Sequence, residues 1–154
     1  MPLTAGVEAP LFRLEDQDGN TYALAELSGR KVLLYFYPKD DTRGCTMEAQ
    51  QFNELLRRFE DGGIVVLGVS ADDARSHQRF RAKYGLRFPL LCDTGAEVAK
   101  AYDAYGERHS FGKTVVGVKR STFLIDEGGR IERAWYDVRP DGHPEAVLAE
   151  VVAS

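Results

Sequence analysis

The sequence has few cysteines and lacks the segments that mark membrane or secreted proteins. Only Cys45 and Cys92 are cysteines among 154 residues, too few for a secreted disulfide framework. The longest apolar runs, 32–37 and 64–69, are far shorter than the roughly 20 residues of a membrane helix. No basic segment followed by an apolar one, as in a signal peptide, opens the chain. We therefore expect a cytoplasmic protein, outside the membrane, whose cysteines are thiols.

Basic blocks and clusters of metal ligands are also absent from the sequence. The net charge is -4, and the lysines and arginines are scattered, so we expect no nucleic-acid partner. The three histidines, His77, His109 and His143, lie far apart and suggest no metal site. Hydrophobic residues make up 44% of the chain and charged residues 29%, which is typical of a globular protein. The length predicts one domain spanning residues 1–154.

Hydrophobic patterning predicts an α/β fold. The apolar run at 31–38 fits a strand buried on both faces, and Phe52, Leu55, Leu56 and Phe59 share one face of a helix. The predicted elements are a hairpin with its turn at 16–20, strands at 31–38, 64–72 and 88–93, helices at 45–60, 73–84 and 95–106, a hairpin at 121–138 and a closing helix at 143–153. This order predicts a three-layer sandwich with a mixed central sheet.

Cys45 is expected in the first turn of a helix, just beyond the carboxyl end of a central strand. Chemistry in open α/β sheets gathers at that edge. The helix dipole favours a thiolate by about 0.3–1 kcal/mol, whereas lowering a thiol pKa by two to three units requires about 3–4 kcal/mol. We therefore expect an arginine nearby as well. The Thr42 hydroxyl and the backbone N–H groups of Gly44 and Cys45 are candidate hydrogen-bonding partners for the sulfur or a substrate.

Spacing argues against two other cysteine chemistries. A Cys-x-x-Cys redox motif would need a cysteine where Glu48 stands, and a phosphatase loop would need an arginine where Gln51 stands. A Cys–His hydrolase stays open, although no local signature for it is apparent.

Several segments resemble the peroxiredoxins of the Q type, also called the bacterioferritin comigratory protein group. The segment 37–49, "YPKDDTRGCTMEA", matches their motif Pro-x-x-x-Thr-x-x-Cys with Pro38, Thr42 and Cys45. The segment 117–126, "GVKRSTFLID", resembles the one that carries the active-site arginine, here Arg120. The segments 6–19 and 134–143 also resemble the family, so the likeness covers nearly the whole chain in the right order.

The resemblance implies a thioredoxin-like fold and a thiol peroxidase that needs no metal or organic cofactor. Cys45 would attack hydrogen peroxide or an organic hydroperoxide and become a sulfenic acid. Arg120 would supply the cation, Pro38 would shield the sulfur from water, and Glu48 would orient Arg120. A thioredoxin-like protein or a low-molecular-weight thiol would be the reductant, and the family favours a monomer.

The sequence departs from the family where the second cysteine is usually found. Residue 50 is Gln50, and residues 73–84 contain no cysteine. Arg43 also stands where the family usually has proline. We therefore expect a one-cysteine cycle, with a two-cysteine cycle through Cys92 or a redox sensor or chaperone as alternatives. A thiol–disulfide oxidoreductase is disfavoured by Glu48.

Four residues also have a structural interpretation that involves no part in catalysis. Cys92 would be a small apolar core residue, and Arg120 would form a surface salt bridge. Glu48 would be a solvated acid that complements the helix dipole. Asp40, with its neighbour at 41, is expected on a solvated face of the loop.

Overall fold

The helices and strands follow the predicted order, with one additional hairpin. The structure is a computed structural model that describes residues 2–110 and 112–152. In chain order, its elements are β1 (Arg13–Glu15), β2 (Thr21–Ala23), the 3-10 helix η1 (Leu24–Leu27), β3 (Lys31–Phe36), α1 (Arg43–Asp61), β4 (Ile64–Ser70), α2 (Ala74–Tyr84), β5 (Leu90–Cys92), α3 (Glu97–Ala101), β6 (Tyr105–Ser110), β7 (Lys113–Val118), β8 (Ser121–Ile125), β9 (Ile131–Trp135) and α4 (His143–Val152). The last residue of the predicted closing helix, 153, lies outside the described residues.

The central sheet is mixed, as predicted. Its strand order is β5-β4-β3-β8-β9, with β3, β4 and β5 parallel and β8 and β9 antiparallel to their neighbours. Leu34 of β3 is in register with Leu67 on one side and Phe123 on the other. The trailing hairpin therefore extends the sheet beyond β3, and β3 occupies its centre.

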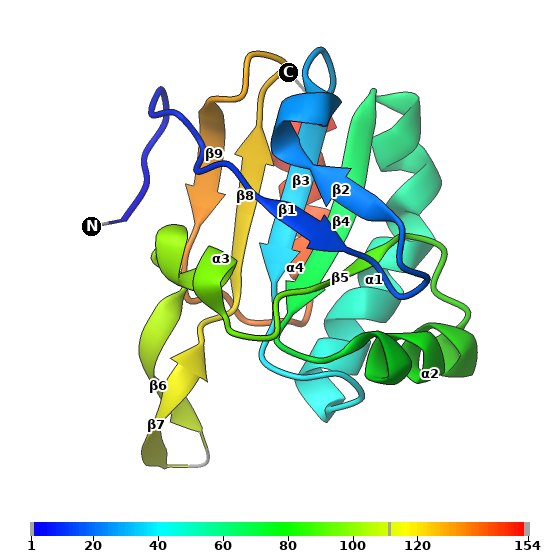
Figure 1. Cartoon of the computed structure of the whole chain (residues 1–154), viewed down its shortest axis with the longest axis vertical. Coiled ribbons are helices and arrows are strands. Elements are labelled where there is room, and N and C mark those ends of the chain that lie inside the picture. The colour runs from blue at the N-terminus through cyan, green and yellow to red at the C-terminus, as the bar shows by residue number, and fades with distance from the viewer. Residues whose placement is uncertain (1, 111, 153–154) are drawn as a thin grey trace.

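Side chains alternate between the two faces of this sheet because successive residues of a strand point to opposite sides. Leu33 and Tyr35 join one buried cluster with residues of α1 and α4. Leu34 and Phe36 join a second cluster with residues of α3 and the segment around β1. Figure 1 shows the sheet between these two layers. The fold is thus the three-layer sandwich that the sequence predicts.

The predicted helix at 95–106 is wrong in its second half. The helix ends at Ala101, and Asp103 adopts a left-handed conformation with φ 57° that stops it. The chain then forms β6 and β7, which pair with each other and project beyond the sheet (Figure 1). The sequence did not reveal this hairpin because half of the residues of β7 are exposed and the strand lacks a regular apolar alternation.

The carboxyl ends of β3, β4 and β5 form one edge of the sheet, and β6–β7 project at that same end (Figure 1). The loops that follow these strands therefore lie at the same end of the sheet as the hairpin. None of the described helices combines the length and apolar character needed to cross a membrane.

Candidate active site

Cys45 lies in the first turn of α1, as predicted, one loop after the end of β3. Thr42 is the N-cap residue, and its carbonyl accepts a hydrogen bond from the Thr46 N–H at 2.8 Å. The Cys45 side chain is only 1% exposed. The first amides of a helix have no partner within it, so they concentrate partial positive charge near this sulfur.

Arg120 lies between β7 and β8 and bridges the thiol and a carboxylate. Its Nη2 donates to Cys45 Sγ at 3.4 Å, and its Nη1 donates to Glu48 Oε1 at 2.7 Å. Burial alone would lower the pKa of Arg120, but Glu48 and Cys45 outweigh that effect and raise it. The guanidinium therefore stays charged, and the surface salt bridge considered from the sequence is wrong.

Glu48 is fully buried rather than solvated, so that simpler interpretation is also wrong. Burial raises the pKa of Glu48 to about 7, against the lowering effect of Arg120. Its Oε2 has no hydrogen-bond partner within the described part of the chain. Glu48 thus anchors one arm of the Arg120 fork while the other arm points at the sulfur.

Thr42 and Gly44 lie beside this group. The Thr42 hydroxyl donates to the Lys39 carbonyl at 2.9 Å, so its proton is directed to the backbone and not to the sulfur. Its lone pairs stay available to accept a hydrogen bond. A Cβ atom on Gly44 would lie 3.2 Å from Arg120 Nη2 and 3.2 Å from Pro140 Cγ. Gly44 therefore lets Arg120 come close to the helix start.

A pocket of about 490 Å³ opens beside Arg120. Its lining residues are Pro38, Glu107, Arg108, His109, Lys119, Arg120, Asp137 and Val138. Pro38 therefore lines the same pocket as Arg120. Three lining residues, 107–109, belong to the β6–β7 hairpin, and they were not predicted site residues because the sequence does not predict that hairpin.

The loop 37–42, between β3 and α1, holds a second group of buried polar residues, which the sequence does not predict. Asp40 is 7% exposed, so the prediction of a solvated Asp40 is wrong. Its Oδ2 lies 2.6 Å from Nδ1 of the fully buried His77. The two residues are 37 positions apart, and no sequence pattern links them. Among the described residues, one group has the geometry to hold a metal ion, namely Asp40, Asp72 and His77. Each of these side chains already bonds to protein groups.

Cys92 lies at the end of the edge strand β5, whereas Arg120 leads into β8, on the other side of the central strand β3. It is partly exposed, and its Sγ donates to the Asp16 carbonyl at 3.9 Å. Burial first, and then Asp40 and other nearby carboxylates, raise the pKa of this thiol to about 11. Cys92 is therefore a poor nucleophile at neutral pH.

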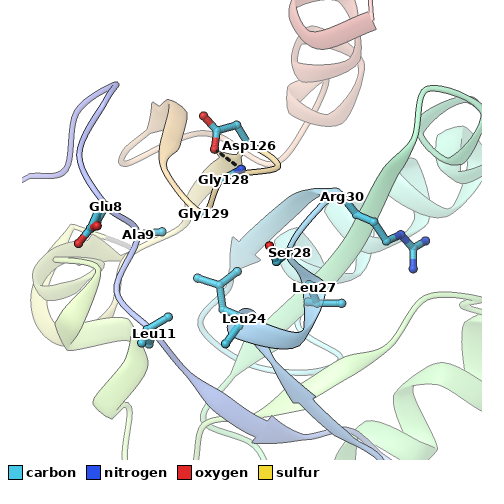
Figure 2. Close-up of a pocket in the computed structure, with 11 residues that line it drawn as sticks. Glu8, Ala9, Leu11, Leu24, Leu27, Ser28, Arg30, Asp126, Gly128 and Gly129 are labelled. Atoms are coloured by element: carbon cyan, nitrogen blue, oxygen red, sulfur yellow. Dashed lines mark hydrogen bonds between the residues drawn. The ribbon is translucent and has the colours of Figure 1, made fainter.

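A further pocket, of about 290 Å³, lies at the opposite end of the sheet (Figure 2). Leu11, Leu24 and Leu27 line it together with the Asp126–Gly129 turn. It is next to Arg30, which precedes β3, whereas Cys45 follows β3. The six residues of β3 separate the two places by roughly 20 Å, so this pocket is not part of the thiol site.

A buried thiol at a helix start, held by an arginine on a thioredoxin-like sandwich, is typical of a cysteine-dependent peroxidase. The AhpC/TSA family model matches residues 5–134. The chain is 40% identical over 147 residues to Peroxiredoxin Bcp of Escherichia coli, covering 96% of this chain and 94% of that protein.

Solved structures give the same result. A cysteine-to-serine mutant of Xylella fastidiosa PrxQ superposes with a TM-score of 0.92 at 38% identity, covering 99% of this chain and 98% of that one. The bacterioferritin comigratory protein of Xanthomonas campestris gives 0.89 at 40% identity, covering 97% and 98%. The chain therefore belongs to the AhpC/TSA family, as a thiol peroxidase of the peroxiredoxin type. The family resemblance, the fold class and the enzyme class expected from the sequence are confirmed.

Proposed function

We propose that Cys45 is the residue that attacks the peroxide. The observation that carries this proposal is the contact between Arg120 Nη2 and Cys45 Sγ at 3.4 Å, with the other arm of Arg120 fixed by Glu48. The thiolate attacks the terminal oxygen of the peroxide, so an S–O bond forms as the O–O bond breaks. The other oxygen leaves and takes a proton as water or an alcohol, and Cys45 becomes a sulfenic acid.

The neighbours of Cys45 have separate tasks in this step. Arg120 stabilises the thiolate and the negative charge that develops on the leaving oxygen. The Thr42 hydroxyl accepts a hydrogen bond from the peroxide, and the amides of Gly44 and Cys45 offer further donors. Pro38, on the pocket wall, limits the access of water to the sulfur. Glu48 acts through Arg120 as a positioning residue.

Hydrogen peroxide and organic hydroperoxides are the proposed substrates. The pocket beside Arg120 has room for a substituent on the peroxide. The bacterioferritin comigratory protein of Xanthomonas campestris has alkyl peroxide reduction activity. This similarity supports an organic hydroperoxide as a substrate of the present protein as well.

A one-cysteine cycle fits the placement of the second cysteine. Strand β4 separates β5 from β3, and the two thiols have different partners: Cys92 Sγ donates to the Asp16 carbonyl, whereas Cys45 Sγ accepts from Arg120 Nη2. A direct disulfide would need their Cα atoms within about 7 Å. An external thiol, either a thioredoxin-like protein or a small thiol, would then form a mixed disulfide with Cys45 and release water. A second thiol would restore the Cys45 thiol.

The test compares Cys45→Ser with Cys92→Ser in peroxide consumption with dithiothreitol as reductant. We expect Cys45→Ser to abolish catalysed consumption and Cys92→Ser to leave it unchanged. Unchanged consumption in Cys45→Ser would refute the proposal. A single round of oxidation, with no turnover by dithiothreitol or thioredoxin, would instead favour a redox sensor.

A further inference from the structure

We infer that Asp40 and His77 form a positioning pair that fixes the 37–42 loop and, through it, the first turn of α1 that carries Cys45. This inference rests on the proposed function of Cys45. Neither residue touches the sulfur, and both lie at the contact of the loop with α2 and β5. The pair would set the rate of the peroxide reaction by holding Cys45 in its reactive geometry.

The His77 ring is fully buried, and both of its nitrogens face oxygen atoms. Nε2 lies 2.9 Å from the Leu91 carbonyl, and a carbonyl cannot donate, so Nε2 must carry a hydrogen. Nδ1 lies 2.6 Å from Asp40 Oδ2, with one hydrogen between them. Both ring contacts are therefore directional, which ties the loop to β5 through a single side chain.

Asp40 is the centre of this network. Its Oδ1 accepts from the Tyr37 hydroxyl at 2.5 Å, and its Oδ2 also accepts from Ser76 Oγ at 2.9 Å. Its backbone N–H donates to Asp72 Oδ2 at 2.8 Å. One loop residue is thus bonded to Tyr37 at the start of the same loop, to the loop after β4 and to α2. Removing the imidazole would leave a buried oxygen of Asp40 with one hydrogen-bond partner fewer.

The backbone next to Asp40 shows why such an anchor is needed. Asp41 has φ 58°, a left-handed conformation that is unfavourable for a residue with a side chain. Such conformations persist where the surroundings hold them. The side chain of Asp41 contacts Lys83 and Tyr84, but these contacts are exposed and weak by comparison. The contacts of Asp40, among them the buried one to His77, therefore restrain this backbone, and the next residue, Thr42, caps the helix that carries Cys45.

The test uses two substitutions that each keep one of the two ring contacts. In His77→Asn the amide nitrogen lies near the position of Nδ1 and keeps the bond to Asp40. In His77→Gln it lies near the position of Nε2 and keeps the bond to the Leu91 carbonyl. The readout is the second-order rate constant for oxidation of Cys45 by hydrogen peroxide. We expect His77→Gln to lower it roughly tenfold to a hundredfold and His77→Asn to stay within roughly threefold of the wild type.

A matched control lies beside His77 on the same helix. Gln78→Ala removes the bond from Gln78 Nε2 to the Gln17 carbonyl, 2.8 Å long, without touching the loop. We expect its rate constant to equal that of the wild type. Circular dichroism verifies that each variant is folded. If His77→Gln does not fold, Asp40→Asn, which keeps the size of the side chain, replaces it and should show the same loss.

Two results would overturn the inference. One is a His77→Gln rate constant that equals that of the wild type or of His77→Asn. The other is an unchanged rate constant in Asp40→Asn. A wild-type protein that does not react with peroxide would instead refute the proposed function, so the two failures are distinguishable.

Discussion

At the scale of single residues, the site depends on the fork of one guanidinium. Arg120 has two arms that reach two different groups, Glu48 Oε1 at 2.7 Å and Cys45 Sγ at 3.4 Å. Arginine presents several donors in a rigid plane, whereas lysine has one flexible ammonium group. The planar geometry therefore matters in addition to the charge.

Arg120→Lys tests this geometry. The ammonium keeps the positive charge but cannot serve Glu48 and Cys45 in the same arrangement, so we expect the rate constant for Cys45 oxidation to fall by roughly a hundredfold. Stopped-flow measurement with hydrogen peroxide gives this rate constant. Arg130→Lys, at an exposed arginine that contacts Glu8 and the Gly6 carbonyl, is the control and should change nothing. If the rate constant of Arg120→Lys lies within about twofold of the wild type, which is on the order of experimental scatter, the positive charge alone is sufficient for the reaction of Cys45.

Glu48→Gln tests the buried carboxyl through the pH dependence of stability. Folding raises the pKa of Glu48 from its ordinary value of 4.5 to about 7, so the folded state binds an extra proton between these values. Its contribution to the free energy of unfolding is therefore largest below pH 4.5 and is lost as the pH rises through 7. The free energy of unfolding of the wild type minus that of Glu48→Gln should fall by about 3 kcal/mol as the pH rises from 4.5 to 7. Urea unfolding at several pH values measures it, and a flat difference would contradict the prediction.

At the scale of elements, the site is assembled where several of them end. The end of β3, the start of α1, the junction of β7 and β8 and the β6–β7 hairpin each contribute residues to it. The parallel strands beside the site pack closely at Gly68. This residue of β4 lies between β3 and β5, and a Cβ atom there would come within 3.0 Å of Leu90 Cδ2 and 3.1 Å of Tyr35 Cε1.

Gly68→Ala should destabilise the protein by about 1–3 kcal/mol because the added methyl group overpacks a rigid core. Gly128→Ala is the matched control, because its Cβ atom would have an ordinary contact of 3.5 Å with Asp126 Oδ1. We expect that control to stay within about 0.5 kcal/mol of the wild type. Chemical unfolding measures both values, and equal stability of the two variants would mean that β3 and β5 move apart easily.

At the scale of the whole molecule, the sheet keeps the two cysteines apart. Cys45 lies beside Arg120, which leads into β8, and Cys92 ends β5 at the far edge of the sheet. In the folded structure the two sulfurs have different partners, Arg120 Nη2 for Cys45 and the Asp16 carbonyl for Cys92. Whether the oxidised protein carries a sulfenic acid at Cys45 or a Cys45–Cys92 disulfide therefore depends on the fold as much as on the reactivity of Cys45.

Oxidation with one equivalent of peroxide should leave a sulfenic acid at Cys45 in the native protein. Labelling with dimedone and intact-mass spectrometry would detect it. In urea just below the unfolding midpoint, opening of the structure should let a Cys45–Cys92 disulfide compete with labelling, and Cys92→Ser should abolish that species. A disulfide formed at once in native buffer would contradict the prediction and favour a two-cysteine cycle.

The sequence by itself determined the order of the central elements and the place of Cys45. Buried strands need apolar residues on both faces, and an amphipathic helix repeats every three to four residues, so both leave a local pattern. The motif around Cys45 is equally local, and the resemblance to peroxiredoxins added Arg120. The β6–β7 hairpin left no such pattern, because it buries little.

Only the tertiary structure decided which distant side chains meet. It placed Glu48 in the core against Arg120, and it bonded Asp40 to His77 across 37 positions of sequence. It also put Cys92 on the edge strand β5, while Arg120 leads into β8 on the other side of β3. Charged groups are buried only where a partner compensates them, and that partner is chosen by the packing of elements rather than by neighbours in sequence.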